Sequence, residues 1–296
     1  MNTLLYKLRK LNPLISTERE ETKNRYFPPK IPFSATASAE PKWPCIWNKK
    51  TSGIIFLHGL ATPGGVNDIM RLMSGTALGL SNCRNKIVAP KAPKAPVTIF
   101  PPSMIPLRIT KIRSWYDFWL MPGLSVVSPI AGENKDHLEE ALGWVEEEIE
   151  NMIQEGIPPE NIVLSGASQG GSLTLYTALH TKYEIGGFIP LVAWQPLLKI
   201  EPPASLPTPI NKHTPIFHMN GKLDPIVPLI CGWKTSEAFK RVFTRYELKT
   251  VVGTHLTSVN PLTIPNIYCF LKKRVRGSMA FDPLNMIHRL NPCWGW

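Results

Sequence analysis

The chain has 296 residues, of which 43% are hydrophobic, so it is long enough to bury a full core and too apolar to be disordered throughout. Much of the net charge of +11 lies at the two ends: residues 1–25 hold six Lys/Arg against three Glu, and residues 271–296 hold five against one Asp. Because the body has only a modest excess and no recognisable nucleic-acid-binding motif, the sequence argues against nucleic acid as a partner.

The cysteines and the apolar runs limit the class of protein further. The five cysteines are odd in number and lack C-x-x-C spacing, so they indicate neither a disulfide framework nor a zinc site. No apolar run approaches the roughly 20 residues of a membrane span. We therefore expect a cytoplasmic protein without a cofactor or metal. A mitochondrial location is the alternative, because the first 16 residues are basic and amphipathic.

Composition divides the chain into three segments. Residues 1–50 are polar and aperiodic, and we predict an N-terminal extension there. Residues 51–276 carry the regular patterns of a folded domain, and residues 277–296 are predicted to be a C-terminal tail. The domain opens with an apolar run at residues 54–57 that is typical of a buried strand.

The next part of the domain combines a short strand, a long loop and the clearest helix. A strand at residues 86–90 stops at a proline, and a long Pro-rich loop is expected over residues 91–113. The helix begins near Asp136, and Gly156 followed by Pro158 should end it. Its apolar residues recur at steps of three and four, at Leu138, Leu142, Val145, Ile149 and Met152.

Strands and helices alternate over the rest of the domain. The patterns predict strands at residues 161–166, 186–194, 215–221 and 245–251, and helices at residues 169–179, 234–243 and 265–275. Such alternation implies right-handed βαβ units. We therefore expect an α/β protein with a mostly parallel central sheet flanked by helices.

A G-x-S-x-G motif, Gly166-Ala167-Ser168-Gln169-Gly170, stands between a predicted strand and a predicted helix. In this context the serine sits on a sharp strained turn, and the flanking positions must lack side chains so that strand and helix can approach. The helix N-terminus supplies free N–H groups for a developing negative charge. Ser168 is therefore a candidate nucleophile, and a Gly-rich packing turn is the alternative interpretation.

A serine nucleophile needs a base and a carboxylate that orients it. Asp224 follows one predicted strand and His255 follows another, in the chain order Ser, Asp, His that α/β-hydrolases use. A turn aspartate and a surface histidine are the structural alternatives. His58-Gly59 ends the first strand, so the backbone amides of Leu60 and Gln169 are the candidate donors to an oxyanion hole.

These motifs resemble the acyl-protein thioesterase / lysophospholipase-like carboxylesterase family, within the α/β-hydrolase superfamily. The resemblance covers residues 52–271. It is carried by "IIFLHGL", "APKAPV", "SWYDFW", "GIPPENIVLSGASQGGSLTLYTAL", "HMNGKLDPIVPL" and "GTHLTS". The chain departs from the family in having Ala61 where a glycine usually follows H-G-L.

The resemblance implies a catalytic triad of Ser168, His255 and Asp224. It also implies cleavage of long-chain acyl thioesters from S-palmitoylated proteins, while many members hydrolyse small esters or lysophospholipids. The expected partners are thus S-acylated proteins or acyl-ester lipids. Two hypotheses remain beside this one: a carboxylesterase or lysophospholipase, and an inactive binding protein on the same scaffold.

The acyl chain needs an apolar surface, because each buried CH₂ contributes about 0.8 kcal/mol. We predict that the loop at residues 97–107 covers it, with Phe100, Met104 and Ile105 as lining, and that Trp115 also contacts substrate. The basic segment at residues 108–113 suits transient contact with an anionic membrane surface, and a solvated charged face explains it equally well. The sequence predicts no particular oligomeric state.

Overall fold

The structure is a computed structural model that describes residues 52–61, 85–98, 109–120, 130–197 and 208–256, together with Thr263, Asn266, Ile267, Cys269 and Phe270. Its strands are β1 (Ser52–Leu57), β2 (Asn85–Val88), β3 (Lys94–Val97), β4 (Ile109–Arg113), β5 (Phe118–Leu120), β6 (Ile130–Glu133), β7 (Ile162–Ala167), β8 (Gly187–Leu191), β9 (Ile216–Gly221) and β10 (Tyr246–Val251). Its helices are α4 (Lys135–Gln154), α5 (Gln169–His180) and α6 (Leu229–Val242), with a short 3₁₀ turn, η1 (Pro159–Asn161).

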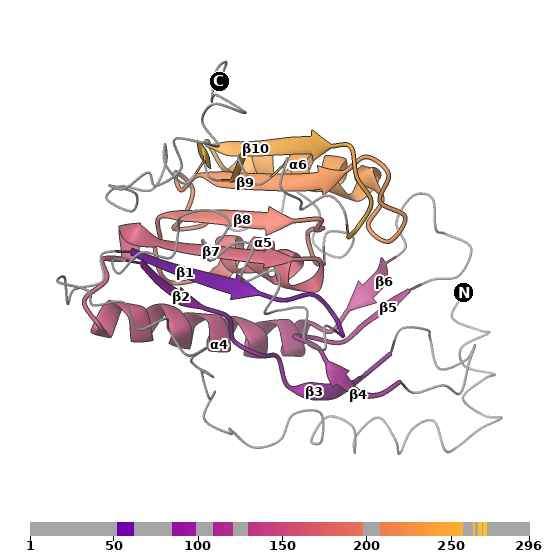
Figure 1. The fold of residues 1–296 in the computed structure, drawn as a ribbon, viewed down its shortest axis with the longest axis horizontal. Coiled ribbons are helices and arrows are strands. Elements are labelled where there is room, and N and C mark those ends of the chain that lie inside the picture. Colours follow the sequence, from indigo (N-terminus) through magenta and orange to yellow (C-terminus); the bar gives the residue numbers. More distant parts are fainter. Residues whose placement is uncertain are drawn as a thin grey trace.

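A six-stranded sheet with the order β10-β9-β8-β7-β1-β2 forms the centre of the fold (Figure 1). All of its neighbouring strands run parallel. Parallel strands end at a common edge, which we call the carboxyl edge. The predicted α/β class with a mostly parallel sheet is therefore confirmed.

Two antiparallel ribbons, β3–β4 and β5–β6, extend beyond this sheet (Figure 1). The sequence analysis was wrong to expect one long loop over residues 91–113, because both β3 and β4 lie there. Prolines hide the strand pattern in this segment. The β3–β4 register shifts between Ala95 and Val97, around Pro96, whose nitrogen has no hydrogen to donate to the ladder.

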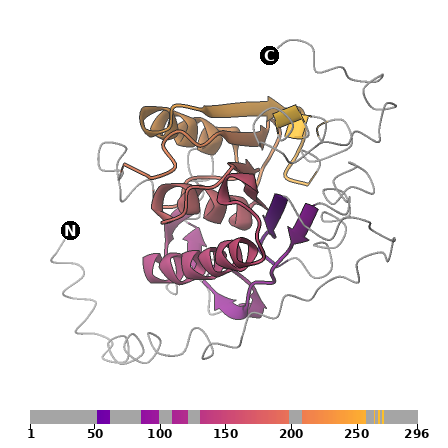
Figure 2. The ribbon, with the colours of Figure 1, turned by 90° about the vertical axis from the view of Figure 1, so that its left-hand side faces the viewer.

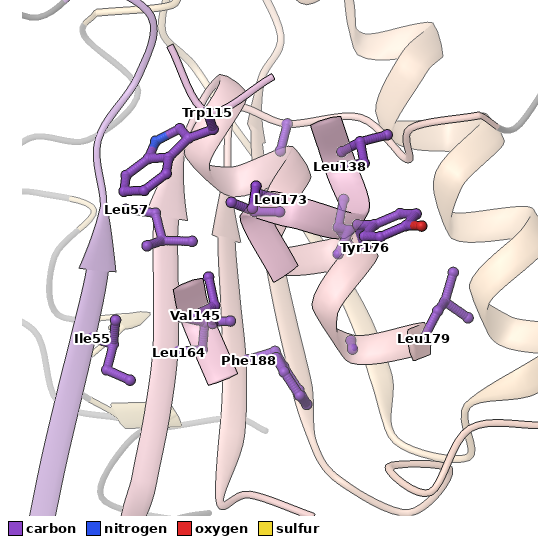
Figure 3. Packing of buried hydrophobic residues seen from close by; sticks show 14 of the residues in the cluster. Ile55, Leu57, Trp115, Leu138, Val145, Leu164, Leu173, Tyr176, Leu179 and Phe188 are labelled. Carbon is purple, nitrogen blue, oxygen red and sulfur yellow. The ribbon is translucent and has the colours of Figure 1, made fainter. Parts of the chain in front are cut away.

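Buried side chains fill both faces of the central sheet, as expected for parallel strands. Helices α4, α5 and α6 cover one face (Figure 2), and the large cluster beneath them includes Leu57, Leu164 and Phe188 (Figure 3). On the opposite face the rings of Phe217 and Phe270 stack with centroids 5.3 Å apart. Successive residues of β1 and β7 alternate between the two clusters, so each strand is anchored on both sides.

Helix α4 ends as the sequence predicts. Gly156 adopts a φ of 86°, which a glycine accepts without strain. The Ile157 N–H donates to the Met152 carbonyl at 3.1 Å, and the Gly156 N–H donates to the Ile153 carbonyl at 2.9 Å. This left-handed turn directs the chain through η1 into β7, the strand that leads to Ser168.

Two further features of the described residues concern membrane spans and cysteines. Within the described part of the chain, no helix is both long and apolar enough to cross a membrane. Cys269 is disulfide-bonded, whereas Cys231 is a buried free thiol. The cysteine spacing in the sequence gave no indication of this bond.

Candidate active site

Ser168 sits at a sharp turn between β7 and α5. Its backbone has φ 54° and ψ −120°, a conformation that costs a non-glycine residue about 1–3 kcal/mol. Two backbone hydrogen bonds hold this conformation: the Ser168 N–H donates to the Leu191 carbonyl at 2.9 Å, and the Ser168 carbonyl accepts from the Ser172 N–H at 2.8 Å. The strained turn is thus set by the neighbouring strand and by the helix that follows.

The glycines around Ser168 allow the turn to pack. A side chain at Gly166 would overlap the backbone of Gly170, and one at Gly170 would overlap the Leu57 carbonyl of β1. A Cβ at Gly171 would lie 2.8 Å from the Leu191 carbonyl oxygen, closer than Cβ contacts allow. All three positions therefore need glycine so that α5 can approach the sheet.

Asp224 and His255 lie on the loops that follow β9 and β10. The Asp224 Oδ2 and the His255 Nδ1 are 2.7 Å apart, and the side chain of Asp224 is fully buried. The other carboxylate oxygen, Oδ1, accepts the N–H groups of Ile226 at 2.8 Å and Val227 at 2.9 Å. Because a carboxylate only accepts hydrogen bonds, Nδ1 is the nitrogen that donates to Asp224, and in the neutral tautomer with this contact the lone pair is on Nε2.

The three residues reach the carboxyl edge from separate strands. In the register of the sheet, Ala167 pairs with Leu191 and Leu191 with Met219, so β7 and β8 end together, while β9 and β10 run two residues further and end at the pair of Gly221 and Val251. Within the described residues the Ser168 hydroxyl makes no hydrogen bond, to His255 or to any other group. In free enzymes this contact is often loose and tightens with substrate.

The turn after β1 packs directly against the serine. A Cβ at Gly59 would lie 3.3 Å from the Ser168 Cβ and 3.9 Å from its hydroxyl oxygen, so a side chain there would crowd the nucleophile. Neither the Leu60 N–H nor the Gln169 N–H donates to another residue that the structure describes. These are the two amides that the sequence analysis assigned to the oxyanion hole.

His58 holds that turn in place as a neutral, buried imidazole. Its Nε2 accepts the Ala92 N–H at 3.0 Å, so its Nδ1 carries the proton and donates to the Gly59 carbonyl at 2.7 Å. Burial lowers the pKa of His58 below its usual value, and Arg113 adds to this effect. The neutral ring is therefore the form that fits both hydrogen bonds.

Trp115 lies beneath the site and has no exposed surface. The sequence analysis expected it to contact substrate, but its indole Nε1 donates to the His58 carbonyl at 2.8 Å and its ring packs beside Leu57 in the core (Figure 3). A fully covered ring cannot offer surface to a substrate. The structure thus gives Trp115 the role of positioning the turn that carries Leu60.

The side chain of Gln169 adds a second link to the same segment, one that sequence reasoning missed. Its Oε1 accepts the Trp115 N–H at 3.0 Å, and its Nε2 donates to the Tyr116 carbonyl at 2.7 Å and to the Ser114 hydroxyl at 2.9 Å. The position of this glutamine inside the G-x-S-x-G motif was the signal in the sequence that could have indicated such a role. Gln169 therefore joins the turn at Ser168 to residues 114–116, the segment that supports the His58 turn.

The loop after β8 separates Ser168 from Asp224, and Glu133 holds it. The buried Glu133 carboxylate accepts the Trp194 indole N–H at 2.9 Å and the Leu197 N–H at 3.2 Å. The Trp194 backbone N–H donates to the Ser172 hydroxyl at 3.2 Å. Sequence reasoning missed Glu133, because an acid at the end of a short strand gives no pattern to read.

Three predicted substrate contacts, Phe100, Met104 and Ile105, lie outside the described residues, as does most of the loop at residues 97–107. The basic segment at residues 108–113 is described in its backbone as β4 from Ile109 onward, and the side chain of Arg113 donates to the Ala92 carbonyl at 2.8 Å. Part of its charge thus supports the structure beside the His58 turn.

The sequence matches a known protein family over most of its length. Residues 45–274 match the model of the family described as phospholipase/carboxylesterase. The chain belongs to this family. Its fold and its match together identify it as an α/β-hydrolase, a hydrolytic enzyme of the thioesterase or carboxylesterase type.

Curated relatives in this family include two fungal enzymes named acyl-protein thioesterase 1. The Gibberella zeae protein is 29% identical over 77% of this chain and 92% of its own length, and the Saccharomyces cerevisiae protein is 29% identical over 74% and 91%. Among solved structures, Arabidopsis thaliana SOBER1 has a TM-score of 0.62 and 28% identity, covering 76% of this chain and 100% of that one. Zea mays acyl-protein thioesterase 2, at 18% identity and a TM-score of 0.54, supports the fold alone.

Proposed function

We propose that this family member is a serine hydrolase that removes long-chain acyl groups from S-acylated proteins through an acyl-enzyme intermediate on Ser168. The observation that carries the proposal is the 2.7 Å contact between His255 and a fully buried Asp224, at the sheet edge where Ser168 occupies a strained turn. A buried carboxylate that orients an imidazole is what a serine nucleophile requires. The names of the fungal relatives favour thioesters.

Acylation would begin when the Ser168 hydroxyl oxygen bonds to the acyl carbonyl carbon and its proton passes to the His255 Nε2. Asp224 would stabilise the imidazolium that results, and the amides of Leu60 and Gln169 would donate to the oxyanion. Collapse of this intermediate breaks the carbon–sulfur bond. The thiolate of the substrate then takes the proton from His255 and leaves.

Deacylation would repeat these steps with water as the nucleophile. His255 accepts a proton from water as the water oxygen bonds to the acyl carbon, and the same two amides donate to the second oxyanion. The bond to the Ser168 oxygen then breaks and the hydroxyl recovers the proton, which releases a fatty acid. No cofactor takes part in this scheme.

The acyl side of the site remains a prediction from sequence. Phe100, Met104 and Ile105 would line it, and S-acylated proteins or acyl-ester lipids would be the partners. Residues 51–276 would form the catalytic domain, with the segments at residues 1–50 and 277–296 outside it. We also propose a cytoplasmic location, with mitochondria as the alternative, and microscopy of the full chain fused to a fluorescent protein distinguishes the two.

A carboxylesterase or lysophospholipase is the second candidate, and the description of the matched family favours it. The experiment that separates the two is a chain-length series of acyl thioesters with matched oxygen esters. We expect the highest kcat/KM for long-chain thioesters, and loss of all turnover in Ser168→Ala. An optimum at short oxygen esters would contradict the thioesterase proposal and support the alternative.

A further inference from the structure

The loops that carry Asp224 and His255 also expose large apolar side chains. Leu223, Ile226, Val252 and Leu256 are 65, 59, 75 and 85% exposed, and we refer to these four as the apolar rim. Among the residues that the structure describes, they are four of the six large apolar side chains with such exposure. Exposed apolar residues that cluster in this way mark an interaction surface.

Three contacts join the two loops into one surface. The Lys222 N–H donates to the Val251 carbonyl at 2.8 Å, and the Leu223 N–H donates to the Gly253 carbonyl at 3.0 Å. The third contact is the pair of Asp224 and His255. The two loops begin at the neighbouring carboxyl ends of β9 and β10, which are drawn as arrowheads in Figure 1. Because the same loops carry Asp224 and His255, the apolar rim borders the proposed catalytic residues.

The charge beside the apolar rim is positive. Asp224 is the sole acidic residue within residues 222–227 and 252–256, and its carboxylate is buried and paired with His255. Lys222, in the same loop, is exposed. Apolar side chains next to an exposed cation suit a bilayer that contains anionic lipids, because the apolar groups enter the acyl region while the ammonium meets the headgroups. A second copy of the chain would instead bring two such cations together with no exposed acid from these loops.

The exposure of the apolar rim also favours a bilayer over a single acyl chain. A side chain that lines a groove is covered on its flanks, whereas all four of these side chains are more than half exposed. They therefore project from the surface. We propose that the apolar rim docks on anionic bilayers and so holds the carboxyl edge against the membrane where S-acyl groups reside. The purpose, though not the docking itself, rests on the proposed function.

Co-sedimentation of the full chain with vesicles tests this docking. The vesicles contain phosphatidylcholine alone or phosphatidylcholine with phosphatidylserine, and the proteins compared are the unaltered chain, Ser168→Ala, Leu223→Asn/Leu256→Asn, Val252→Asn and Lys222→Glu. The matched control is Ile210→Asn, which removes an exposed apolar residue that precedes β9, at the opposite edge of the sheet. Thermal melting checks that each variant is folded.

We expect the unaltered chain, Ser168→Ala and Ile210→Asn to bind the vesicles with phosphatidylserine equally. The double variant should bind about tenfold more weakly, because two leucines no longer enter the lipid. Lys222→Glu should lose the preference for phosphatidylserine. Because binding is measured without substrate and also in Ser168→Ala, failure of the thioesterase proposal leaves this test intact.

Equal binding by the unaltered chain and the folded rim variants would overturn the proposal, as would an equal loss in Ile210→Asn. Val252→Asn keeps the test decisive if the double variant does not fold. Sedimentation velocity without vesicles measures whether the chain is a monomer or a dimer. A dimer that the rim variants convert to a monomer, with no vesicle binding by any form, would show that the apolar rim is an interface between copies and would also overturn the proposal.

Discussion

The two sides of the candidate site differ in how firmly they are held and how much they expose. On the serine side, His58, Trp115 and Gln169 are all fully buried, and each has a side-chain hydrogen bond to the backbone of a neighbouring segment: His58 with Ala92, Trp115 with His58, and Gln169 with Trp115. On the carboxylate side, Asp224 is equally buried, but its neighbour Leu223 and the other residues of the apolar rim face outward.

This difference fits the tasks that the two sides would perform. Oxyanion donors must already be in place when charge develops, because their effect depends on not having to reorganise. A site for a lipid-modified substrate must also be open on the side from which the substrate arrives. One side is thus built for the chemistry and the other for access.

The largest effect is expected on the carboxylate side, from Asp224→Asn. The amide can donate to His255 Nδ1 and so favour the tautomer that cannot act as a base, which should lower kcat by about 10⁴. Steady-state hydrolysis of a soluble ester measures this. Asp136→Asn, which changes an exposed acid of α4, is the control and should leave kcat unchanged. A fall of less than tenfold in the folded variant would show that Asp224 does not orient the base.

The next largest effect is expected on the free energy of unfolding, through His218 on the carboxylate side and His58 on the serine side. Burial lowers the pKa of His218, in β9, to about 4, and it lowers that of His58 as well. Because the unfolded chain then binds protons that the native chain does not, the free energy of unfolding should fall as the pH drops below about 6.5.

For His218 the predicted loss between pH 6.5 and pH 4 is about 3 kcal/mol. Denaturant titrations at several pH values measure it. His218→Gln should flatten the curve, since the amide does not titrate and can still bond to the Tyr246 hydroxyl, 2.5 Å from the His218 Nδ1. A stability that is constant over this range would show that these histidines are not neutral in the folded protein.

A smaller effect is expected on the serine side, from Trp115→Phe. The ring still fills the core, but the His58 carbonyl loses its indole donor, so the turn that carries Leu60 should loosen. We expect kcat to fall by about tenfold with little change in KM, as when an interaction made in the transition state is weakened. The control is Trp233→Phe, at an exposed position of α6. A rise in KM at unchanged kcat would instead indicate a substrate contact.

The smallest effect is expected from Ala61→Gly, also on the serine side. Ala61 adopts a φ of 50°, in the region that favours glycine, so the exchange should raise the free energy of unfolding by up to about 1 kcal/mol. The reverse exchange at Gly156, with φ 86°, should lower it by a similar amount. Thermal melting of both variants checks the pair. Destabilisation by Ala61→Gly would show that the turn is not strained.

Much of the fold could be predicted from the sequence, because its signals are local. The spacing of apolar residues in α4 and the glycine that ends it are short patterns that do not depend on distant contacts. The inner strands of the central sheet are buried throughout, so each of them shows in the sequence as a short apolar run. The ribbon of β3 and β4 was missed, since its register depends on a proline-containing irregularity that no short pattern encodes.

The site divides in the same way. Ser168, Asp224 and His255 each follow a strand, so their common edge could be predicted from chain order and topology. The roles of Trp115 and Glu133 could not, because each acts through contacts with segments more than 50 residues away in the sequence. Trp115 was expected to contact substrate, whereas the structure covers its ring completely.

The central claim is that Ser168 is the nucleophile of a relay with His255 and Asp224, and active-site mapping tests it most directly. The full chain is treated with a fluorophosphonate, which reacts with activated serines, and the modified peptide is identified by mass spectrometry. The account predicts one adduct, on Ser168, that is absent in Ser168→Ala and strongly reduced in His255→Ala. An adduct on another residue, or ester hydrolysis that persists in Ser168→Ala, would contradict it.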